Sequence, residues 1–487
     1  MSAPNQTTGS KLTRRDLDTG SVLRGPILLF FISGLFWLLI GAALWLLSVF
    51  QAVDPFVSWV FPDIPWLTYG RVYPVAMDLL VYGWASMTGV GIAIWILNRL
   101  ANNPFTGGFI PLLAALIWNV GLIAGVWAVL GGGSTGREWL EFPAYSAFLI
   151  WLAELIMAVW VVSLFISRRT KGAYIAQAFL LAAFVSFAWA YGAANALLLL
   201  ANVGGPAQAA IQWWYFGCLF GLWLSPLAVG IVYYFVPLLA GRPLYSAKLA
   251  AISFWGLIGF GGWIGITQVT GGPFPVWMQT FGIVAQVLLV IPILTVATNL
   301  HLTMKGSFDL LKTNLALRFL VVGGMIFGLA GIWNALCSFR SINWILQFTW
   351  AQPARIYLAL IGFVSLVCFG AIYYILPRLV GRDWVYTKVI RFHFWVTIVG
   401  LGFVAFTLTI AGVLQGLGLM DAKVPFAAVL DLIRPFLLGQ VLAVAIIAVS
   451  ALLGVFSFLT VFVNPAWAPE SSETPEPIIG EGEVTIA

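Results

Sequence analysis

The stretch Tyr233-Tyr-Phe-Val-Pro-Leu-Leu-Ala-Gly-Arg242 is the most informative about the fold, because it recurs in altered form as Tyr373-Tyr-Ile-Leu-Pro-Arg-Leu-Val-Gly-Arg382. The pair Phe254-Trp255 recurs at the same offset, as Phe394-Trp395. Each copy ends one apolar segment, crosses a basic loop and enters the next apolar segment. The recurrence predicts a unit of four helices, about 140 residues long, that is used three times.

The composition indicates a membrane protein. Hydrophobic residues make up 62% of the chain and charged residues 8%, whereas soluble domains have about 45–50% and about 25%. Because lipid cannot satisfy backbone polar groups, apolar runs of about 20 residues are expected to be helices. The runs predict an all-α bundle of twelve transmembrane helices, at 26–52, 74–97, 109–131, 143–167, 175–200, 209–239, 249–270, 279–299, 315–338, 354–378, 392–416 and 435–463.

Several classes of function are excluded. The net charge of +6 is divided among loops between apolar runs, so no nucleic-acid-binding surface is expected. Cys218, Cys337 and Cys368 are scattered, and we expect small apolar roles for them rather than metal or redox chemistry. The Gly-rich segment 131–136 lacks the Gly-Lys-Ser/Thr ending of a phosphate loop, and we expect a flexible loop outside the membrane.

The distribution of positive charge predicts the orientation. All Lys and Arg residues fall on one side of the twelve spans except Arg71, Arg137, Arg340, Arg355, Lys423 and Arg434. The richer side is expected to be cytoplasmic, with both termini on it. We expect a cytoplasmic segment at 1–25, the transmembrane domain at 26–463, and a disordered acidic cytoplasmic tail at 464–487.

Three further segments complete a resemblance to a known family. They are Trp66-Leu-Thr-Tyr-Gly-Arg71, followed by Pro74; Trp213-Trp-Tyr215; and His393-Phe-Trp395. With the repeated stretch, they resemble the second, sixth, tenth and eleventh helices of subunit I of the heme-copper oxidase superfamily, and most closely the cbb-type (C-family) cytochrome c oxidases. The resemblance covers about residues 26–463. It implies a bacterial inner-membrane protein with two hemes and one copper, docked to c-type cytochrome subunits.

The family holds its metals with six His residues, whereas this chain has two His in total. The resemblance assigns the heme-ligand positions to Ala76, Arg355 and Tyr357, and the copper-ligand positions to Gly217, Thr267 and Gln268. The cbb-type Tyr near the copper would fall on Gly261. None of these positions holds the family's residue, so we expect no metal site and no cofactor in this chain.

The two His residues do not replace the missing ligands. His301 and His393 lie at inner helix ends, where we expect interfacial, hydrogen-bonded roles. Tyr can ligate heme iron, which makes Tyr357 a weak heme candidate. Met77 and Cys218 neighbour ligand positions but are turned about 100° away on a helix. The space beside Ala76 would be filled by aromatic side chains, lipid, quinone or another cofactor.

Three charged residues fall within or at the edges of apolar spans. They are Asp78, Glu154 and Arg355. A charge at the bilayer centre costs at least about 2.5–3.5 kcal/mol, so each is expected to face the interior, to pair or to be neutral. Asp78 and Glu154 would then carry protons or serve as buried structural acids. We expect Asp78 and Arg355 to form an acid–base pair in place of the lost heme.

The sequence therefore predicts a cytochrome c oxidase subunit I-like membrane subunit of a bacterial respiratory complex. Its expected roles are scaffold, cytochrome docking, or a proton or quinone pathway, with membrane lipid and c-type cytochrome subunits as partners. Two alternatives stay open. One is an active terminal oxidase or nitric-oxide reductase with unusual ligation, and the other is an ion or proton transporter on the same bundle. Whether the chain is an enzyme is left open as well.

Overall fold

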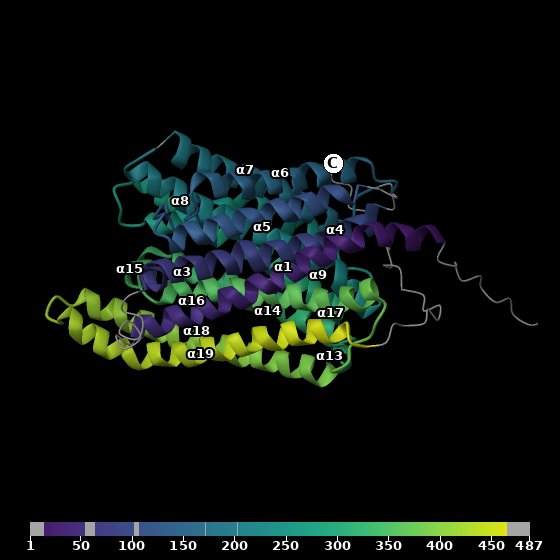
Figure 1. Ribbon diagram of the computed structural model, residues 1–487. Helices are drawn as coiled ribbons and strands as arrows, with labels where there is room; N and C mark the ends of the chain where they lie inside the picture. The colour runs from purple at the N-terminus through teal and green to yellow at the C-terminus, as the bar shows by residue number, and fades with distance from the viewer. Residues whose placement is uncertain (1–13, 54–63, 102–106, 171, 202, 465–487) are drawn as a thin grey trace, which may run out of the picture.

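The computed structural model describes residues 14–53, 64–101, 107–170, 172–201 and 203–464, with side chains from residue 22 onward. These residues include twelve helices that are long and apolar enough to cross a membrane, as predicted. Figure 1 shows the helices side by side in one elongated bundle. Residues 1–13 and 465–487, which contain half of the predicted N-terminal segment and nearly all of the predicted tail, lie outside the described residues.

The bundle has an inner and an outer set of spans. The three inner spans are α3–η2–α4 (Tyr69–Asp78, Leu79–Ser86, Met87–Ala101), α8–η4–α9 (Pro206–Cys218, Leu219–Leu224, Ser225–Ala240) and α16–η6–α17 (Ala351–Tyr357, Leu358–Ser365, Leu366–Val380). The nine outer spans are α1 (Arg14–Val53), α5 (Phe109–Leu130), α6 (Ala144–Ile166), α7–η3 (Ile175–Asn195, Ala196–Leu200), α10–η5 (Ala247–Phe260, Gly261–Val269), α11–α12 (Val276–Leu288, Val290–Met304), α14 (Leu315–Ser338), α18 (Thr387–Met420) and α19 (Phe426–Val461). Short helices are η1 (Pro65–Leu67), α13 (Leu310–Thr313) and α15 (Arg340–Leu346).

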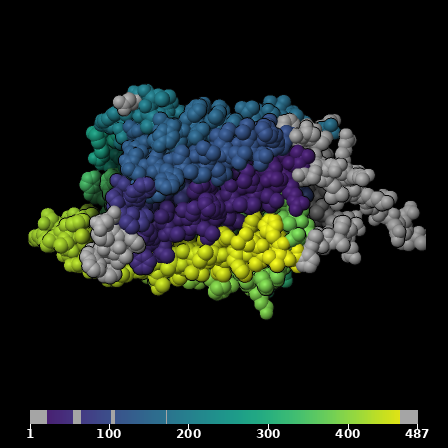
Figure 2. Space-filling view, viewed as in Figure 1, coloured from purple at the N-terminus to yellow at the C-terminus, as the bar shows by residue number. Residues whose placement is uncertain are grey.

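Burial separates the two sets clearly. In the most apolar part of each inner span, 100%, 94% and 89% of residues are buried, against 39–56% in the outer spans. The outer helices therefore keep one face for lipid, while the inner helices are enclosed by protein. The first and last spans meet in this outer layer: α1 and α19 pack together, and Figure 2 shows them as adjacent purple and yellow bands.

Each inner span is interrupted by a π-helical segment at the same place. The segments start at Leu79, Leu219 and Leu358, at spacings of 140 and 139 residues. A π-helical turn adds a residue to the helix and shifts the side chains that follow. The interruption thus recurs with the period that the repeated sequence predicts.

Hydrogen bonds between the inner spans follow the same period. Trp223 Nε1 donates to Ser86 Oγ, and Trp84 Nε1 donates to Ser365 Oγ, each over 2.8 Å. The third equivalent pair is Phe363 and Ser225, where the ring has no N–H to donate. Two of the three joints around the centre of the bundle are therefore hydrogen-bonded.

The repeated stretch forms the same helix ending twice. Gly241 and Gly381 have φ of 64° and 67°, a left-handed conformation that a residue without Cβ adopts readily. The following Arg242 and Arg382 amides donate to the carbonyls of Pro237 and Pro377 over 3.1 and 3.2 Å. This is the hydrogen-bonding pattern of a glycine-terminated helix, and it explains why Gly-Arg recurs.

Some helix bounds differ from the prediction. The helix of the first span extends back to Arg14, and the last two spans approach each other through Met420 and Phe426 rather than ending at 416 and beginning at 435. Pro435, at the predicted start of the last span, lies inside α19 instead. Figure 1 shows the α18–α19 hairpin projecting beyond the other helices.

Candidate functional site

The ligand positions assigned by the resemblance cluster around the π-helical segments. Ala76 lies just before η2, Gly217 just before η4, and Tyr357 immediately before η6. All three are in the enclosed inner spans, with exposures of 1% or less for Ala76 and Tyr357. π-helical turns are frequent at functional sites. The three inner helices therefore keep an irregular geometry at the point where a metal centre would be expected.

Aromatic side chains fill the region between the second and tenth spans. The hydroxyls of Tyr357 and Tyr73 are 3.3 Å apart, and the Tyr357 ring lies 4.6 Å from the ring of Trp45. Tyr73 precedes Ala76 by three residues and so lies on the same side of the helix. The small side chain at position 76 thus faces a space that is occupied by aromatic residues.

Backbone occupies the corresponding place between the sixth and seventh spans. A Cβ on Gly217 would lie 2.6 Å from the carbonyl oxygen of Gly262. In the same way, a Cβ on Gly221 would lie too close to the backbone of Gly261, and a Cβ on Gly265 would lie too close to the carbonyl oxygen of Trp213. Glycines on both sides allow η5 to lie directly on α8 and η4. We call this contact the glycine seam.

The two seventh-span positions lie at the end of this seam. Thr267 Oγ1 donates to the carbonyl of Ile264 over 2.8 Å. The carbonyls of Thr267 and Gln268 accept hydrogen bonds from the side chains of Asn343 and Gln347, at 3.1 and 2.8 Å. These residues tie η5 to the connection between the ninth and tenth spans. Their backbone groups therefore contribute to packing between helices.

A small cavity of about 80 Å³ lies between the sixth and tenth spans. Ser225 and Phe363, the pair that lacks the third Trp–Ser hydrogen bond, both line it, together with Gln286 and Asn334. Pockets that enclose drug-sized ligands have volumes of about 300–1,000 Å³. The cavity is therefore far smaller than a heme group requires.

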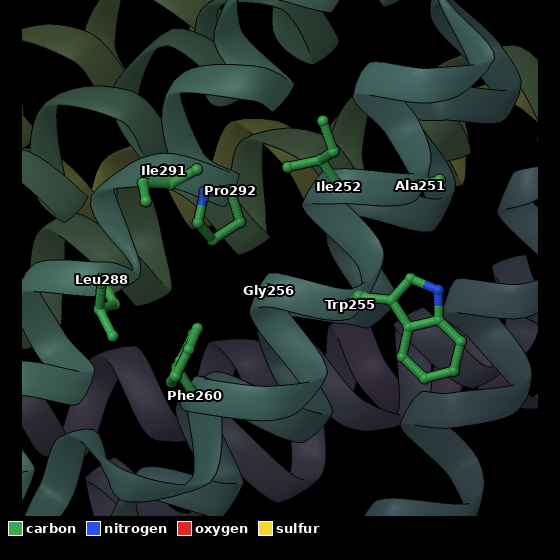
Figure 3. A pocket seen from close by; sticks show the side chains of 8 residues that line it. All are labelled: Ala251, Ile252, Trp255, Gly256, Phe260, Leu288, Ile291 and Pro292. Carbon is green, nitrogen blue, oxygen red and sulfur yellow. The ribbon is translucent and has the colours of Figure 1, made fainter.

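A larger cavity lies on the periphery. Its volume is about 440 Å³, and Figure 3 shows it as a groove between α10 and the α11–α12 helices. The side chains of Ile252, Trp255 and Ile291 on its rim are 47–58% exposed. Its lining is apolar throughout, with Gly256 packed on Pro292 at the bottom. This groove opens toward lipid and lies away from the inner ligand positions.

The predicted pair between Asp78 and Arg355 is wrong. The structure records no ion pair between them, although both residues are among those it describes. Arg355 lies near Cys337, and its Nε has no hydrogen-bond partner. Asp78 is two residues after Ala76, which turns it about 200° around the helix. It therefore points away from the tenth span.

Asp78 instead interacts electrostatically with Glu141, which lies in the loop before α6. Both carboxyl groups are buried, with exposures of 1% and 6%. Tyr82, one turn beyond Asp78, donates to the carbonyl of Trp139 over 2.6 Å, and its oxygen lies 2.7 Å from the hydroxyl of Tyr215. The second span thus packs its acidic side against the loop before α6.

This loop, residues 131–143, is held by hydrogen bonds within it. The Thr135 amide donates to the carbonyl of Glu141 over 3.0 Å, and Thr135 Oγ1 donates to that of Leu140 over 2.7 Å. Trp139 has a φ of 70°, which is uncommon for a residue with a side chain. The Gly-rich part was expected to be a flexible loop, and the two acids that follow it were not among the predicted site residues. The signal was the pair Glu138 and Glu141 in the short segment that leads into the fourth apolar run.

The environment of the loop acids favours their neutral forms. Burial raises the pKa of Glu138 to about 7. Burial also raises the pKa of Glu141 well above its ordinary value, and the nearby Asp78 adds to the effect. Removal from water disfavours a carboxylate, and a second carboxylate nearby disfavours it further. The loop therefore places proton-binding groups at one end of the bundle.

Glu154 lies elsewhere, in the middle of the fourth span. Its side chain is fully buried, and neither carboxyl oxygen has a hydrogen-bond partner. A buried charge without a partner is strongly unfavourable, so the structure favours the neutral acid here. Glu154 is therefore separate from the Asp78–Glu141 pair.

The two His residues differ in their surroundings. His393 is fully buried, so the interfacial role predicted for it is wrong, but its Nδ1 is hydrogen-bonded to the Tyr373 hydroxyl at 2.6 Å. His301 is exposed and its ring lies 5.3 Å from that of Phe308. The three Cys residues are buried and free. Among the described residues, no three His, Cys, Asp or Glu side chains come together as a metal site would require.

Comparison with known proteins identifies the family. The family model described as Cytochrome C and Quinol oxidase polypeptide I matches residues 25–446. A solved structure of a heme-copper terminal oxidase dimer superposes with a TM-score of 0.75 at 15% identity, covering 94% of this chain and 86% of the other. The chain therefore belongs to the heme-copper oxidase subunit I family and has its fold.

Curated relatives agree with this assignment. The bacteroid cytochrome c oxidase subunit 1 homolog of Bradyrhizobium diazoefficiens is 25% identical, over 91% of this chain and 83% of the relative. The subunit 1 homolog of Azorhizobium caulinodans is 26% identical, over 78% and 70%. The Cbb3-type cytochrome c oxidase subunit CcoN1 of Stutzerimonas stutzeri is 25% identical, over 78% and 81%. The chain is thus a multi-pass membrane protein of a bacterial respiratory family.

Proposed function

We propose that this chain is a subunit I-like component of a bacterial respiratory complex that carries no heme–copper centre of its own. Within the family, we place it near the cbb-type branch, because its second, sixth, tenth and eleventh helices resemble that branch most closely. Its work would be to hold a membrane complex together and to dock a membrane-anchored c-type cytochrome, or to provide a proton or quinone pathway.

The observation that carries this proposal is the glycine seam. A copper ion needs clustered imidazole or thiolate side chains around an open volume. At the position of the sixth-span ligand, the carbonyl oxygen of Gly262 lies only 2.6 Å from the place that the Cβ of any side chain on residue 217 would take. The residues present therefore do not fit the copper site.

The heme positions lead to the same conclusion. Tyr357, the residue best able to ligate iron, has its hydroxyl next to that of Tyr73 and its ring against Trp45. A macrocycle at this place would have to displace both contacts. The cavity near Ser225 and Phe363, at about 80 Å³, is too small for the second heme. The aromatic contacts at one heme position and the small cavity near the other both support the proposal.

Absorption spectroscopy and metal analysis test this proposal. The full chain is purified in detergent from a host that also produces the Stutzerimonas stutzeri relative, which is the control for heme supply. We expect less than about a tenth of an equivalent of heme and copper per chain and no reduced-minus-oxidised heme signal. One equivalent of b-type heme in this chain would overturn the proposal and favour an oxidase or nitric-oxide reductase with unusual ligation.

The proposed partner and orientation are tested separately. An affinity-tagged chain is purified from its own membranes under mild detergent, and covalently bound heme c is detected after denaturing electrophoresis. We expect a heme c protein to co-purify with the chain in a fixed stoichiometric ratio. For the orientation, we expect tags at either terminus to be protected from proteases that are added on the outer side of the membrane. A chain that purifies alone and transports ions in liposomes would support the transporter alternative instead.

A further inference from the structure

The peripheral groove between α10 and the α11–α12 helices has a length that matches one leaflet of a membrane. It follows α10 from Ala251 to Phe260, and Figure 3 shows Ile291 and Pro292 on its other side. The helix rises about 14 Å between positions 251 and 260, and half of a bilayer's hydrocarbon core is about 15 Å thick. The groove is therefore long enough for an acyl chain that extends through one leaflet.

The start of α10 and the end of α12 are hydrogen-bonded together at one end of the groove. The Ser246 amide donates to Asn299 Oδ1 over 3.0 Å, and Asn299 Nδ2 donates to the Ser246 carbonyl over 2.9 Å. Ala251 and Pro292 lie one to two turns of helix, about 7–11 Å, inside this contact. The apolar groove therefore begins just inside a fixed polar end.

The charges at this end are all positive. The segment 241–305 is described throughout, and its charged residues are Arg242, Lys248 and Lys305, all of them exposed, with no Asp or Glu. Arg242 donates to the carbonyl of Lys305, which brings two of the cations together. The nearest acid along the chain, Asp309, is already paired with its own neighbouring lysine. Within the described part of the chain, the three cations therefore have no acidic partner.

Lys248 joins this positive end to the groove. It precedes Ala251 and Ile252 by three and four residues, so it lies on the same face of α10 as the groove wall. Helical side chains lean toward the N-terminal end of their helix, which directs the Lys248 ammonium away from the apolar walls. The other end of the groove has no Lys, Arg, Asp or Glu. A ligand with an apolar chain and one anionic end is therefore held in a single orientation.

A transmembrane helix of a partner subunit fits the groove poorly. A helix about 10 Å wide and about 14 Å long takes up about 1,000 Å³, whereas the groove has about 440 Å³. Its bottom is already closed, because a Cβ on Gly256 would lie 2.8 Å from Pro292. The dimensions favour a narrow, flexible chain over a helix.

The third repeat shows what the groove depends on. Lys388 is the equivalent of the groove's lysine, 140 residues later, and is exposed at the start of α18. On that helix Arg391 replaces Ala251, and Val396 replaces Gly256. The small residues that leave room on α10 are therefore absent from α18, which makes Lys388 a matched cation without the same groove wall.

We propose that this groove binds an acyl chain of an anionic phospholipid, with the head group at Lys248. The apolar walls bind the chain, and the cations at the end of the groove select the negative head group, with Arg242 and Lys305 adding to the positive potential. The bound lipid covers the exposed seam between the seventh and eighth spans. This inference is independent of whether the chain binds heme, so its test is separate from that of the proposed function.

Native mass spectrometry of the delipidated full chain in detergent tests the site. Phosphatidylglycerol and phosphatidylcholine with the same acyl chains are added, since they differ in net charge. We expect one phosphatidylglycerol per chain to bind at least about tenfold more tightly than phosphatidylcholine. Because one Lys near a membrane surface changes the affinity for anionic lipid about fivefold, Lys248→Gln should weaken phosphatidylglycerol binding by that factor and leave phosphatidylcholine unchanged.

Two further variants separate the chain from the charge. Ala251→Phe places a ring in the groove and should weaken the binding of both lipids, and Ala251→Leu replaces it if the Phe variant does not fold. The matched control is Lys388→Gln, which removes the equivalent cation in the third repeat and should change neither affinity. Glycerol phosphate, which has the charge without an acyl chain, should not compete.

Three results would overturn the proposal. Equal losses of phosphatidylglycerol binding in Lys248→Gln and Lys388→Gln would mean that the head group is not held at this groove. Equal affinity of the two lipids for the natural chain would remove the selection by charge. A small membrane protein that remains bound in place of the lipid, and is released by Ala251→Phe, would show that the groove binds a helix.

Discussion

The indole Nε1 of Trp84 donates a hydrogen bond to Ser365 Oγ over 2.8 Å and joins the second span to the tenth at the centre of the bundle. Trp84→Phe keeps most of the ring and removes the donor. A buried hydrogen bond contributes about 0.5–1.5 kcal/mol, so we expect the variant to be less stable by about 1 kcal/mol. The measurement is the temperature at which the detergent-solubilised protein loses its monodisperse peak. An unchanged temperature would mean that the joint contributes nothing.

The third joint predicts the opposite effect. Phe363 and Ser225 line the same small cavity, and a Trp at position 363 would fill space there and provide the missing N–H. Cavity-filling changes commonly add about 0.5–2 kcal/mol of stability. We expect Phe363→Trp to raise the melting temperature and Phe363→Leu to lower it. A Trp variant less stable than the natural chain would show that the cavity cannot take the larger ring.

Restoring the family's ligand at position 217 should fail. Gly217→His would push a side chain against the carbonyl of Gly262, so we expect a loss of about 3 kcal/mol or more and no copper binding. The matched control is Gly259→Ala, since nothing lies within 4 Å of a Cβ there. Alanine should be neutral or stabilising at that position by about 0.5–1 kcal/mol. Copper bound by the His variant in metal analysis would refute this expectation.

The two His residues form a natural matched pair. His393→Phe removes the hydrogen bond to Tyr373 in a fully buried place, and we expect it to cost about 1–3 kcal/mol. His301→Phe changes an exposed ring and should stay within about 0.5 kcal/mol. Thermal unfolding of both variants in the same detergent checks the difference. Equal losses would indicate that burial of His393 is not what makes it important.

The pKa of Glu138, raised by burial to about 7 from an ordinary value of 4.5, predicts a pH dependence. Because the folded protein favours the neutral acid, the stability that this group contributes is complete below pH 4.5 and is lost as the pH rises through about 7. The full shift corresponds to about 3 kcal/mol, and partial exposure to solvent reduces this to about 1–3 kcal/mol.

The variant Glu138→Gln stays neutral at every pH and tests this expectation. Its melting temperature relative to the natural chain should rise between pH 4.5 and pH 8 and then level off. Asp421→Asn, in an exposed loop, controls for general charge effects. Curves that remain parallel over the whole pH range would contradict the assignment.

The sequence was sufficient for the spans but not for the contacts within them. Apolar runs located all twelve helices, because a helix in lipid must be long and apolar whatever it packs against. The pairing of Asp78 could not be read in the same way. Which neighbour a residue meets depends on the rotation of its helix, and the π-helical turn after Asp78 changes that rotation. The partner was a loop residue, Glu141, instead of the expected Arg355.

The ligand positions show a related limit. The sequence established that Ala76 and Gly217 are small, but their neighbours come from distant segments. At Ala76 the neighbouring space holds aromatic rings, and at Gly217 it holds the backbone of another span. A small residue can mark either an empty site or a close approach of two helices. Only the position of the second helix distinguishes the two.

The glycine seam also limits which single substitutions this chain can accept. A His at position 217 would meet the backbone of Gly262 before it could bind a metal, because the carbonyl oxygen lies 2.6 Å from the new Cβ. A metal centre at this place would need the seam to open and several ligands to be introduced together. Under the proposed function, the seam therefore makes each ligand costly when it is introduced alone, so that no stepwise path of stable single variants leads to a metal site.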